Sequence, residues 1–317
     1  MPLGDVLAHL VAWLIAPLVA VSRPGEKMFV LYVAGSAVVA LVALRLAGHP
    51  APFRELFARR VWNHPSARVD VRFYLVNGIL AAAVFVPLFA LQHSVMNAVA
   101  HRLSTLVGAR ESSDPGVFVL AAIAVAAALA NDFAIYLPHW LQHRVALLWQ
   151  FHKVHHSAAV LTPLTVFRFH PVDDALNVAS IVGIVGAFDG VLLGLFPTAV
   201  VHQTLFGVNA VLFVFYIGGV HLRHSHVWLA YPRTVSQVLI SPAMHQVHHS
   251  IDPGHHGKNL GLIFSVWDRV FGTLFIPTSR LELRYGLGEG EETEFSSVRR
   301  LYWLPFVKAA RLFRSRA

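Results

Sequence analysis

The sequence predicts an all-α fold, that of a polytopic helical membrane protein with a cytoplasmic helical cap. The chain of 317 residues is 56% hydrophobic and only 13% charged, and its mean hydropathy is +0.58. That is more apolar surface than one soluble core of this size needs to bury. Several windows also approach the roughly 20 apolar residues that span a bilayer. Between and after these windows lie segments rich in histidine.

The expected membrane spans are long apolar windows, and they cover 28–47, 73–91, 117–137, 176–196 and 199–219. The last two flank Pro197 and predict a transmembrane hairpin over about 176–219, which enters and leaves on one side of the membrane. A shorter apolar stretch at 6–21 has no Lys or Arg before it and no small-x-small cleavage pattern after it. We therefore expect it to stay in the mature chain rather than to act as a secretory signal.

The positive charges predict the orientation. The net charge is +8, and 12 of the 25 Lys and Arg residues lie in 220–317. The positive-inside rule places 48–72, 138–175 and the C-terminal third on the cytoplasmic side. We expect an N-terminal transmembrane anchor at 1–130, a histidine-bearing domain with the hairpin at 131–275, and a basic C-terminal tail at 276–317. The expected location is a bacterial inner membrane, with the active site facing the cytoplasm.

Two further features of the composition limit the possibilities. The chain has no cysteine, which excludes disulfides, thiolate-ligated haem, Fe–S clusters and Cys-type zinc sites. The tail ends in "FVKAARLFRSRA", which is basic and amphipathic. It is suited either to an anionic membrane surface or to a solvated terminus.

The spacing of the histidines indicates which imidazoles can bind a metal together. Fifteen of the 20 histidines lie between 139 and 256, and the pattern His-x-x-His-His occurs twice, in "FHKVHHS" and "MHQVHHS". On a helix, positions i, i+3 and i+4 share one face, so each copy predicts three imidazoles that can close on a metal. His139 and His143 in "PHWLQHR" predict a two-nitrogen face. The nine residues from His143 to His152 turn an ideal helix by about 900°, so one centre requires a break between 144 and 151.

Eight or more clustered imidazoles exceed the ligands that one ion uses, which indicates a pair of metal ions. Neutral imidazole suits Zn, Cu, Fe and Ni alike. The Glu-x-x-His signature of carboxylate di-iron bundles is absent from the sequence. A redox-inert pair would suit hydrolysis, whereas a pair of irons would suit O₂ chemistry on apolar, unactivated substrates. A bis-histidine haem protein, a zinc transporter and an inactive metal-binding scaffold are the other classes that the pattern leaves open.

The ordered motifs resemble the fatty acid hydroxylase / sterol desaturase superfamily of membrane di-iron oxygenases. The resemblance covers about 132–273 and rests on "DFAIYLPHWLQHRVALLWQFHKVHHS", "FRFHP", "LISPAMHQVHHS" and "NLGLIFSVWDRVFGT". The N-terminal region is similar in hydropathy only. The segment "LTPLT" lacks an Asn that many relatives carry, and "NLG" stands where many have "NYG", so no relative's substrate is transferred to this chain.

The resemblance implies a set of histidine ligands to two irons. They are His139, His143, His152, His155, His156, His245, His248 and His249, with one further histidine from "GVHLRHSHVW". His224 best matches that further position, and His221 is a second choice. With both of them the expected set has ten histidines. Whether His170 or His226 ligates stays open, and His170 is expected first as a structural or supporting residue. Asp132, Asp173, Asp252 and Asp268 are candidates to orient the ligating rings.

The function implied by the resemblance is O₂-dependent hydroxylation of a membrane lipid, either a fatty acyl chain, a sterol or a related apolar chain, on a di-iron site. Desaturation on the same site is the alternative. The sequence contains no haem, flavin or nicotinamide fingerprint. The electrons are therefore expected from a separate donor of cytochrome b5, ferredoxin or flavoprotein type. No nucleic acid partner is expected, and the oligomeric state stays open.

Overall fold

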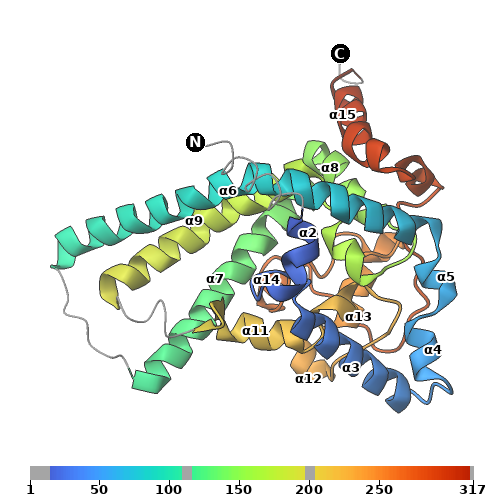
Figure 1. The fold of residues 1–317 in the computed structure, drawn as a ribbon, viewed down its shortest axis with the longest axis horizontal. Coiled ribbons are helices and arrows are strands. Elements are labelled where there is room, and N and C mark those ends of the chain that lie inside the picture. The colour runs from blue at the N-terminus through green and yellow to red at the C-terminus, as the bar shows by residue number, and fades with distance from the viewer. Residues whose placement is uncertain (1–14, 109–115, 197–203, 315–317) are drawn as a thin grey trace.

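The computed structural model describes residues 15–108, 116–196 and 204–314. Figure 1 shows long helices that extend to one side of the molecule and a cluster of short helices and loops at the other. The described chain is mostly helical, as predicted. The helices are α2 (Ala16–Val19), α3 (Val30–Leu46), α4 (Pro52–Leu56), α5 (Arg59–Trp62), α6 (Pro65–Val107), α7 (Gly116–Arg144), α8 (Ala146–His156), α9 (Pro171–Leu195), α11 (Ala210–Ile217), α12 (Arg233–Ser236), α13 (Pro242–His248), α14 (Val266–Val270) and α15 (Val298–Arg314).

Two of the long helices are suited to a membrane. α7 and α9 have 29 and 25 residues, and each contains a window of mean hydropathy 2.1. Only 28% of each window is buried within the protein, whereas the core helix of a soluble protein would be mostly buried. α3 is a shorter apolar helix of 17 residues. α7 and α9 are therefore long and apolar enough to cross a bilayer.

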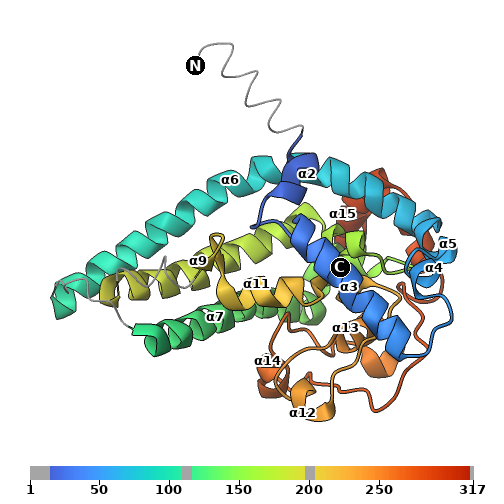
Figure 2. The ribbon, with the colours of Figure 1, turned by 60° about the horizontal axis from the view of Figure 1, so that its bottom comes forward.

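Glycines bring α9 close to α6. The two helices lie side by side over much of their length (Figures 1 and 2). Gly186, Gly190 and Gly194 recur every four residues on α9, so they share one face. A Cβ at Gly190 would lie 2.6 Å from the carbonyl oxygen of Met96 on α6. Small residues at this spacing let two helix backbones approach closely, as in membrane helix pairs.

The second limb of the expected 176–219 hairpin is not one helix in the described residues. The limb's residues 199–203 lie outside them. Thr204–Leu205 (β1) and Val208–Asn209 (β2) then form an antiparallel hairpin. Its turn residues Phe206 and Gly207 both have positive φ, of 52° and 77°, as a two-residue turn of this kind requires. The side chain of Asn209 accepts hydrogen bonds from two backbone N–H groups and starts α11, which has eight residues. Eight residues extend only about 12 Å.

The cluster of short elements, residues 145–170 and 218–297, is called the cap below. Buried Val154 on α8 packs with Phe295, with Leu301 on α15, and with Phe73 on α6. Arg168 is 2% exposed and bonds to Asp70 on α6 at 2.7 Å and to the carbonyl oxygen of Val154 at 3.0 Å. Because breaking a buried, hydrogen-bonded ion pair is costly, these contacts fix α8 against α6. α8 is the element that carries three of the expected ligands.

Candidate metal centre

A break in the chain separates the first two histidine motifs. α7 ends at Arg144 and α8 starts at Ala146, with the extended residue Val145 (φ −99°, ψ 112°) between them. The break lies within 144–151, where the sequence predicts it. It folds α8 back so that the ring of His152 lies 4.9 Å from that of His139 and 4.8 Å from that of His143, measured between centroids.

Nine buried or half-buried histidines gather into two adjacent groups. In each group, one potential ligand atom from every member lies within 4.8 Å of all the others. Group A contains His139, His143, His152, His156 and His248. Group B contains His155, His224, His245 and His249. The groups touch, because the ring of His156 in group A stacks on that of His249 in group B at a centroid distance of 4.6 Å.

Each His-x-x-His-His copy is divided between the two groups. The outer pair of the first copy, His152 and His156, belongs to group A, and its middle histidine, His155, belongs to group B. The second copy does the reverse: His245 and His249 belong to group B, and His248 to group A. The expectation of three imidazoles from one copy on one metal therefore needs correction. Positions i and i+4 converge on one point, whereas the ring at i+3 turns toward the opposite helix.

The ring nitrogens suit metal ions. Nε2 of His143, His152 and His156 in group A is buried without a hydrogen-bond partner. In group B, Nε2 of His224 lies 3.3, 3.1 and 3.0 Å from Nε2 of His155, His249 and His245. Buried, unpaired imidazole nitrogens are costly, and a bound cation satisfies them. Each group offers four or more nitrogen ligands, which is enough for one metal ion.

Burial keeps the grouped imidazoles of the cap neutral. It lowers the pKa of His152, His155 and His156 on α8 well below the usual value, and neighbouring histidines lower it further. The same causes, with the nearby Arg223 guanidinium, lower the pKa of His245 and His224. Neutral imidazole has the free lone pair that a metal ligand needs.

Backbone carbonyls orient two members of group A. Nδ1 of His139 lies 2.8 Å from the carbonyl oxygen of Leu260, and Nδ1 of His248 lies 2.9 Å from that of Lys258. A carbonyl only accepts, so both rings carry their proton on Nδ1 and turn Nε2 toward the group. The two Nε2 atoms are 3.1 Å apart.

Two buried carboxylates hold the loop that supplies the Leu260 carbonyl. Asp132 on α7 accepts hydrogen bonds from the backbone N–H groups of Leu262, Ile263 and Phe264 at 2.7 to 3.1 Å. Asp268 on α14 accepts from those of Leu260 and Gly261 at 2.8 and 2.9 Å. The segment "NLGLIFSVWD" is therefore held by Asp268 within it and by Asp132 on α7, and these two aspartates act on the histidines only through the loop backbone.

A carboxylate and an arginine contact other members directly. Oδ2 of Asp173 on α9 lies 3.4 Å from Nδ1 of His152. Arg223 is 4% exposed, and its Nη2 lies 2.7 Å from Nδ1 of His245 and 2.9 Å from the carbonyl oxygen of Gly261. Of the four aspartates expected to orient ligands, only Asp173 contacts a grouped histidine. Asp252 instead caps a turn at Gly254.

Three histidines flagged by the sequence lie outside both groups. Nε2 of His221 lies 2.8 Å from the carbonyl oxygen of Lys27, so it donates there, and His221 belongs to neither group although its Nδ1 is buried without a hydrogen-bond partner. His170 caps α9: its Nδ1 accepts from Val172, and its Nε2 lies 3.1 Å from the carbonyl oxygen of Tyr302. Nε2 of His226 lies 2.8 Å from the carbonyl oxygen of Glu55. In each case a backbone carbonyl accepts from Nε2, and the ring lies outside the two groups.

Sequence reasoning missed two neighbours of group B. Arg223 precedes His224, but nothing in its spacing points to His245, 22 residues later. The ring of Phe169 stacks on that of His155 at 4.1 Å with 13° between the planes. Its place in "FRFHP", a motif already linked to the histidines, is the only signal that the sequence offers.

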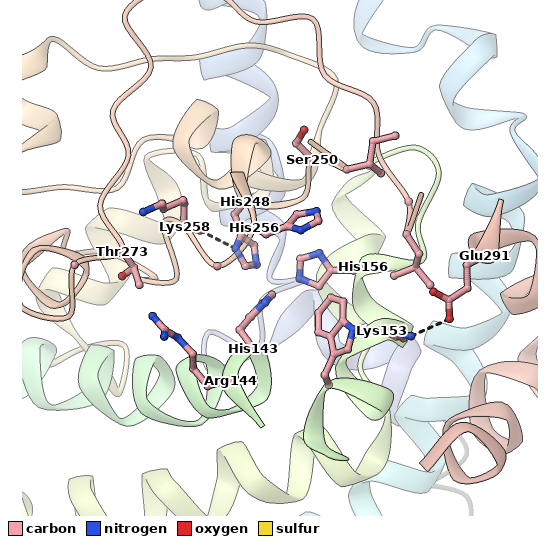
Figure 3. A pocket seen from close by; sticks show the side chains of 16 residues that line it. His143, Arg144, Lys153, His156, His248, Ser250, His256, Lys258, Thr273 and Glu291 are labelled. Carbon is pink, nitrogen blue, oxygen red and sulfur yellow. Dashed lines mark hydrogen bonds and ion pairs between the residues drawn. The ribbon is translucent and has the colours of Figure 1, made fainter. Parts of the chain in front are cut away.

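A pocket opens onto group A from the cap (Figure 3). Its volume is about 440 Å³, and the histidines that line it include His143, His156 and His248. Arg144, Lys153 and Lys258 lie around the same opening, where Lys153 pairs with Glu291 at 2.9 Å. No member of group B lines this pocket. Group A is thus the group reached from this side.

Comparison with known proteins identifies the family of the segment that carries these histidines. The fatty acid hydroxylase family model matches residues 124–273, which include all nine grouped histidines. This segment of the chain belongs to the fatty acid hydroxylase family. The resemblance noted in the motifs is thereby confirmed.

The relatives of this fatty acid hydroxylase segment act on lipids, according to their names. An ornithine lipid hydroxylase of Rhizobium tropici is 30% identical over 46% of this chain and 40% of its own length. A Delta(7)-sterol 5(6)-desaturase of Eremothecium gossypii is 28% identical over 71% and 58%. An alkylglycerol monooxygenase of Caenorhabditis elegans is 25% identical over 51% and 29%. The matches thus span between 29% and 58% of these relatives. No solved structure matches the chain.

Proposed function

We propose that this protein is a membrane-bound, O₂-dependent non-haem di-iron oxidoreductase that hydroxylates a membrane lipid. The observation that carries the proposal is the pair of all-nitrogen groups, A and B, inside a segment of the fatty acid hydroxylase family. Relatives named as hydroxylases, a monooxygenase and a desaturase support oxidation of a lipid. Desaturation is the alternative outcome on the same site.

Iron suits the ligand set better than zinc does. Structural zinc is bound by about four ligands and catalytic zinc by about three. Group A brings five imidazoles together and group B four. Imidazole ligates iron readily, and iron accepts about six ligands. When bound, two irons would supply the O₂ activation that oxidation of an unactivated C–H bond requires.

The protein's own residues hold and shield this centre. Leu260, Lys258 and Asp173 contact the Nδ1 atoms of His139, His248 and His152. Phe169 covers the His155 ring, and the ring of Trp149 lies 5.1 Å from that of His143. The stacked Phe169 ring excludes water from that side of His155, while rigid partners keep the lone pairs aimed at the metals.

The proposed substrate is the apolar chain of a lipid, either a fatty acyl chain, a sterol or a related molecule. α7 begins among the long apolar helices and ends at His139 and His143, so one helix connects the membrane-suited part of the fold with group A (Figure 1). A lipid that leaves the bilayer along these helices would meet the metals at the cap. We also propose that the cap and active site face the cytoplasm of a bacterium, as the positive-inside rule suggests.

A separate electron donor would use the pocket onto group A. The donor class is that of a cytochrome b5, a ferredoxin or a flavoprotein reductase. Arg144 and Lys258 at the opening, where Lys153 is already paired with Glu291, favour a partner with an acidic face, because opposite charges steer docking. His143 and His156 bring group A directly to this surface.

The test is product formation in membranes that contain the full chain. Wild type and a His155→Ala/His248→Ala double variant are expressed under ¹⁸O₂, and the extracted lipids are compared by mass spectrometry. We expect lipids that gain one labelled oxygen in the wild type only. A product that loses two hydrogens without gaining label would assign desaturation instead. Identical lipid profiles under iron-replete conditions with a matched donor would contradict lipid oxidation.

A further inference from the structure

We infer that α15 is an interfacial helix, which lies on a membrane surface containing anionic lipid and holds α8 there. The inference rests on the proposed membrane location, and it adds a contact surface that the metal site does not require. α15 runs across the direction of α6 and α9 rather than along them (Figure 1).

One face of α15 is taken up by the protein. Leu301, Pro305 and Ala309 recur every four residues and are all buried. Leu301 packs in the cluster with Val154 of α8 and Phe73 of α6. These contacts fix how the helix is rotated, and so they determine which residues face outward.

The outward face is an aromatic ridge, formed by Trp303, Phe306, Ala310 and Phe313. At about 100° per residue these positions fall within about 80° of arc. Trp303 is 68% exposed, Phe306 46% and Phe313 65%. Aromatic side chains this exposed, gathered on one helix face, indicate a surface that meets another apolar phase.

The ridge lies on the side where α9 begins. The ring of Phe306 is 5.3 Å from that of His170, which caps α9, and 5.1 Å from that of Phe151 on α8. The carbonyl oxygen of Tyr302 also bonds to His170. Because α9 is long and apolar enough to span a bilayer from Pro171 onward, its first turns mark the level of the membrane interface. The ridge is therefore at the right height to contact lipid.

The charges on α15 select anionic lipid. Residues 296–317 contain no Asp or Glu. Lys308, on the flank away from the ridge, bonds to Glu291 and Glu294 at 2.9 and 3.0 Å. Four exposed arginines lie within or beside the ridge and form no ion pair with a carboxylate in the described part of the chain: Arg299, Arg300, Arg311 and Arg314. Arginines beside exposed aromatics are typical of helices on negatively charged leaflets.

A single-label experiment tests this on the full chain, which has no native cysteine. Ala310→Cys, in the centre of the ridge, carries an environment-sensitive fluorophore. Thr293→Cys is the matched control, exposed in the cap beside the paired Glu291 and Glu294. Both are reconstituted in nanodiscs with or without phosphatidylglycerol and with lipids spin-labelled near the headgroup. We expect quenching at 310 but not at 293, and stronger quenching with phosphatidylglycerol.

Val191→Cys, on the exposed side of α9, separates this inference from the membrane proposal. Quenching at 191 by lipids spin-labelled deep in the acyl chain, together with equal access of aqueous iodide to 310 and 293, would overturn the role of α15 alone. Lack of quenching at 191 would overturn the membrane location itself. A label at 310 that changes only when a second copy or an acidic donor protein is added would assign the ridge to that partner and refute lipid contact.

Discussion

Arg223 donates from Nη2 to Nδ1 of His245 at 2.7 Å, on the side of that group B ring away from His224. The guanidinium is itself held by the carbonyl oxygen of Gly261 at 2.9 Å. Gly261 is in the loop that Asp268 clamps, and the neighbouring Leu260 carbonyl contacts His139 of group A. The same loop thus contacts His139 of group A directly and His245 of group B through Arg223. A shift of this loop would therefore displace a histidine in each group.

We predict that Arg223→Gln weakens metal binding at group B. Arg223 can only donate, so it acts chiefly by holding the carbonyl oxygen of Gly261 and with it the loop behind group B; Gln is too short to reach both His245 and Gly261, and a lost buried hydrogen bond costs about 1–3 kcal/mol. Metal titration of the purified protein in detergent should show one of two sites weakened. Arg233→Gln, at an exposed arginine on α12, is the control. Unchanged affinity at both sites would refute the orienting role.

The hydrogen bonds that Asp132 accepts from the 260–264 loop give a second prediction. Asp132→Asn replaces an oxygen that accepts N–H donors by an amide that itself donates, so buried N–H groups lose their partner. A lost buried hydrogen bond of this kind costs about 1–3 kcal/mol. Asp132→Asn should lower the melting temperature and the metal content, whereas Asp252→Asn, at an exposed turn, should change neither. Wild-type metal content in Asp132→Asn would show that the loop does not position His139.

Close packing of α9 on α6 gives a third prediction. A side chain at Gly190 would meet the carbonyl oxygen of Met96 and the side chain of Val99, whereas a Cβ at Gly183 would meet nothing within 4 Å. Gly190→Val should therefore destabilise the protein by about 1–3 kcal/mol through overpacking. Thermal unfolding in one detergent compares it with Gly183→Val. Equal melting temperatures for the two variants would contradict the predicted contact.

A pH effect is predicted for Glu291, which bridges Lys153 of α8 and Lys308 of α15 at 2.9 Å each. Burial alone would raise the pKa of its carboxyl group, but the two lysines hold the pKa below the ordinary 4.5. A depressed carboxyl pKa contributes stability above pH 4.5, and this is lost as the pH falls through the folded-state pKa.

Glu291→Gln should accordingly melt below the wild type at pH 7, and the difference should shrink on acidification below pH 4.5. The exposed Glu282→Gln is the control. A difference between wild type and Glu291→Gln that stays constant across this pH range would mean that the ion pairs do not link α8 to α15.

The sequence predicts the break between His143 and His152, because helix rotation alone places their faces on opposite sides. It also indicates an all-helical fold and a histidine-rich centre. It could not predict how the histidines are shared, since the i+3 member of each copy meets the other helix only after folding. His221 has the right spacing but donates to the carbonyl of Lys27, a contact across 194 residues. The Phe206–Gly207 turn interrupts a run whose composition alone is that of a membrane helix.

The metal content of detergent-purified protein from iron-replete cells tests the central claim most directly. It would be measured for the wild type, for His155→Ala/His248→Ala, which removes one ligand from each group, and for His93→Ala/His101→Ala, which removes two histidines on α6 outside both groups. The account predicts about two irons per chain in the wild type and in the α6 control, with both lost from His155→Ala/His248→Ala. Zinc alone, no metal, or iron that survives in His155→Ala/His248→Ala would contradict it.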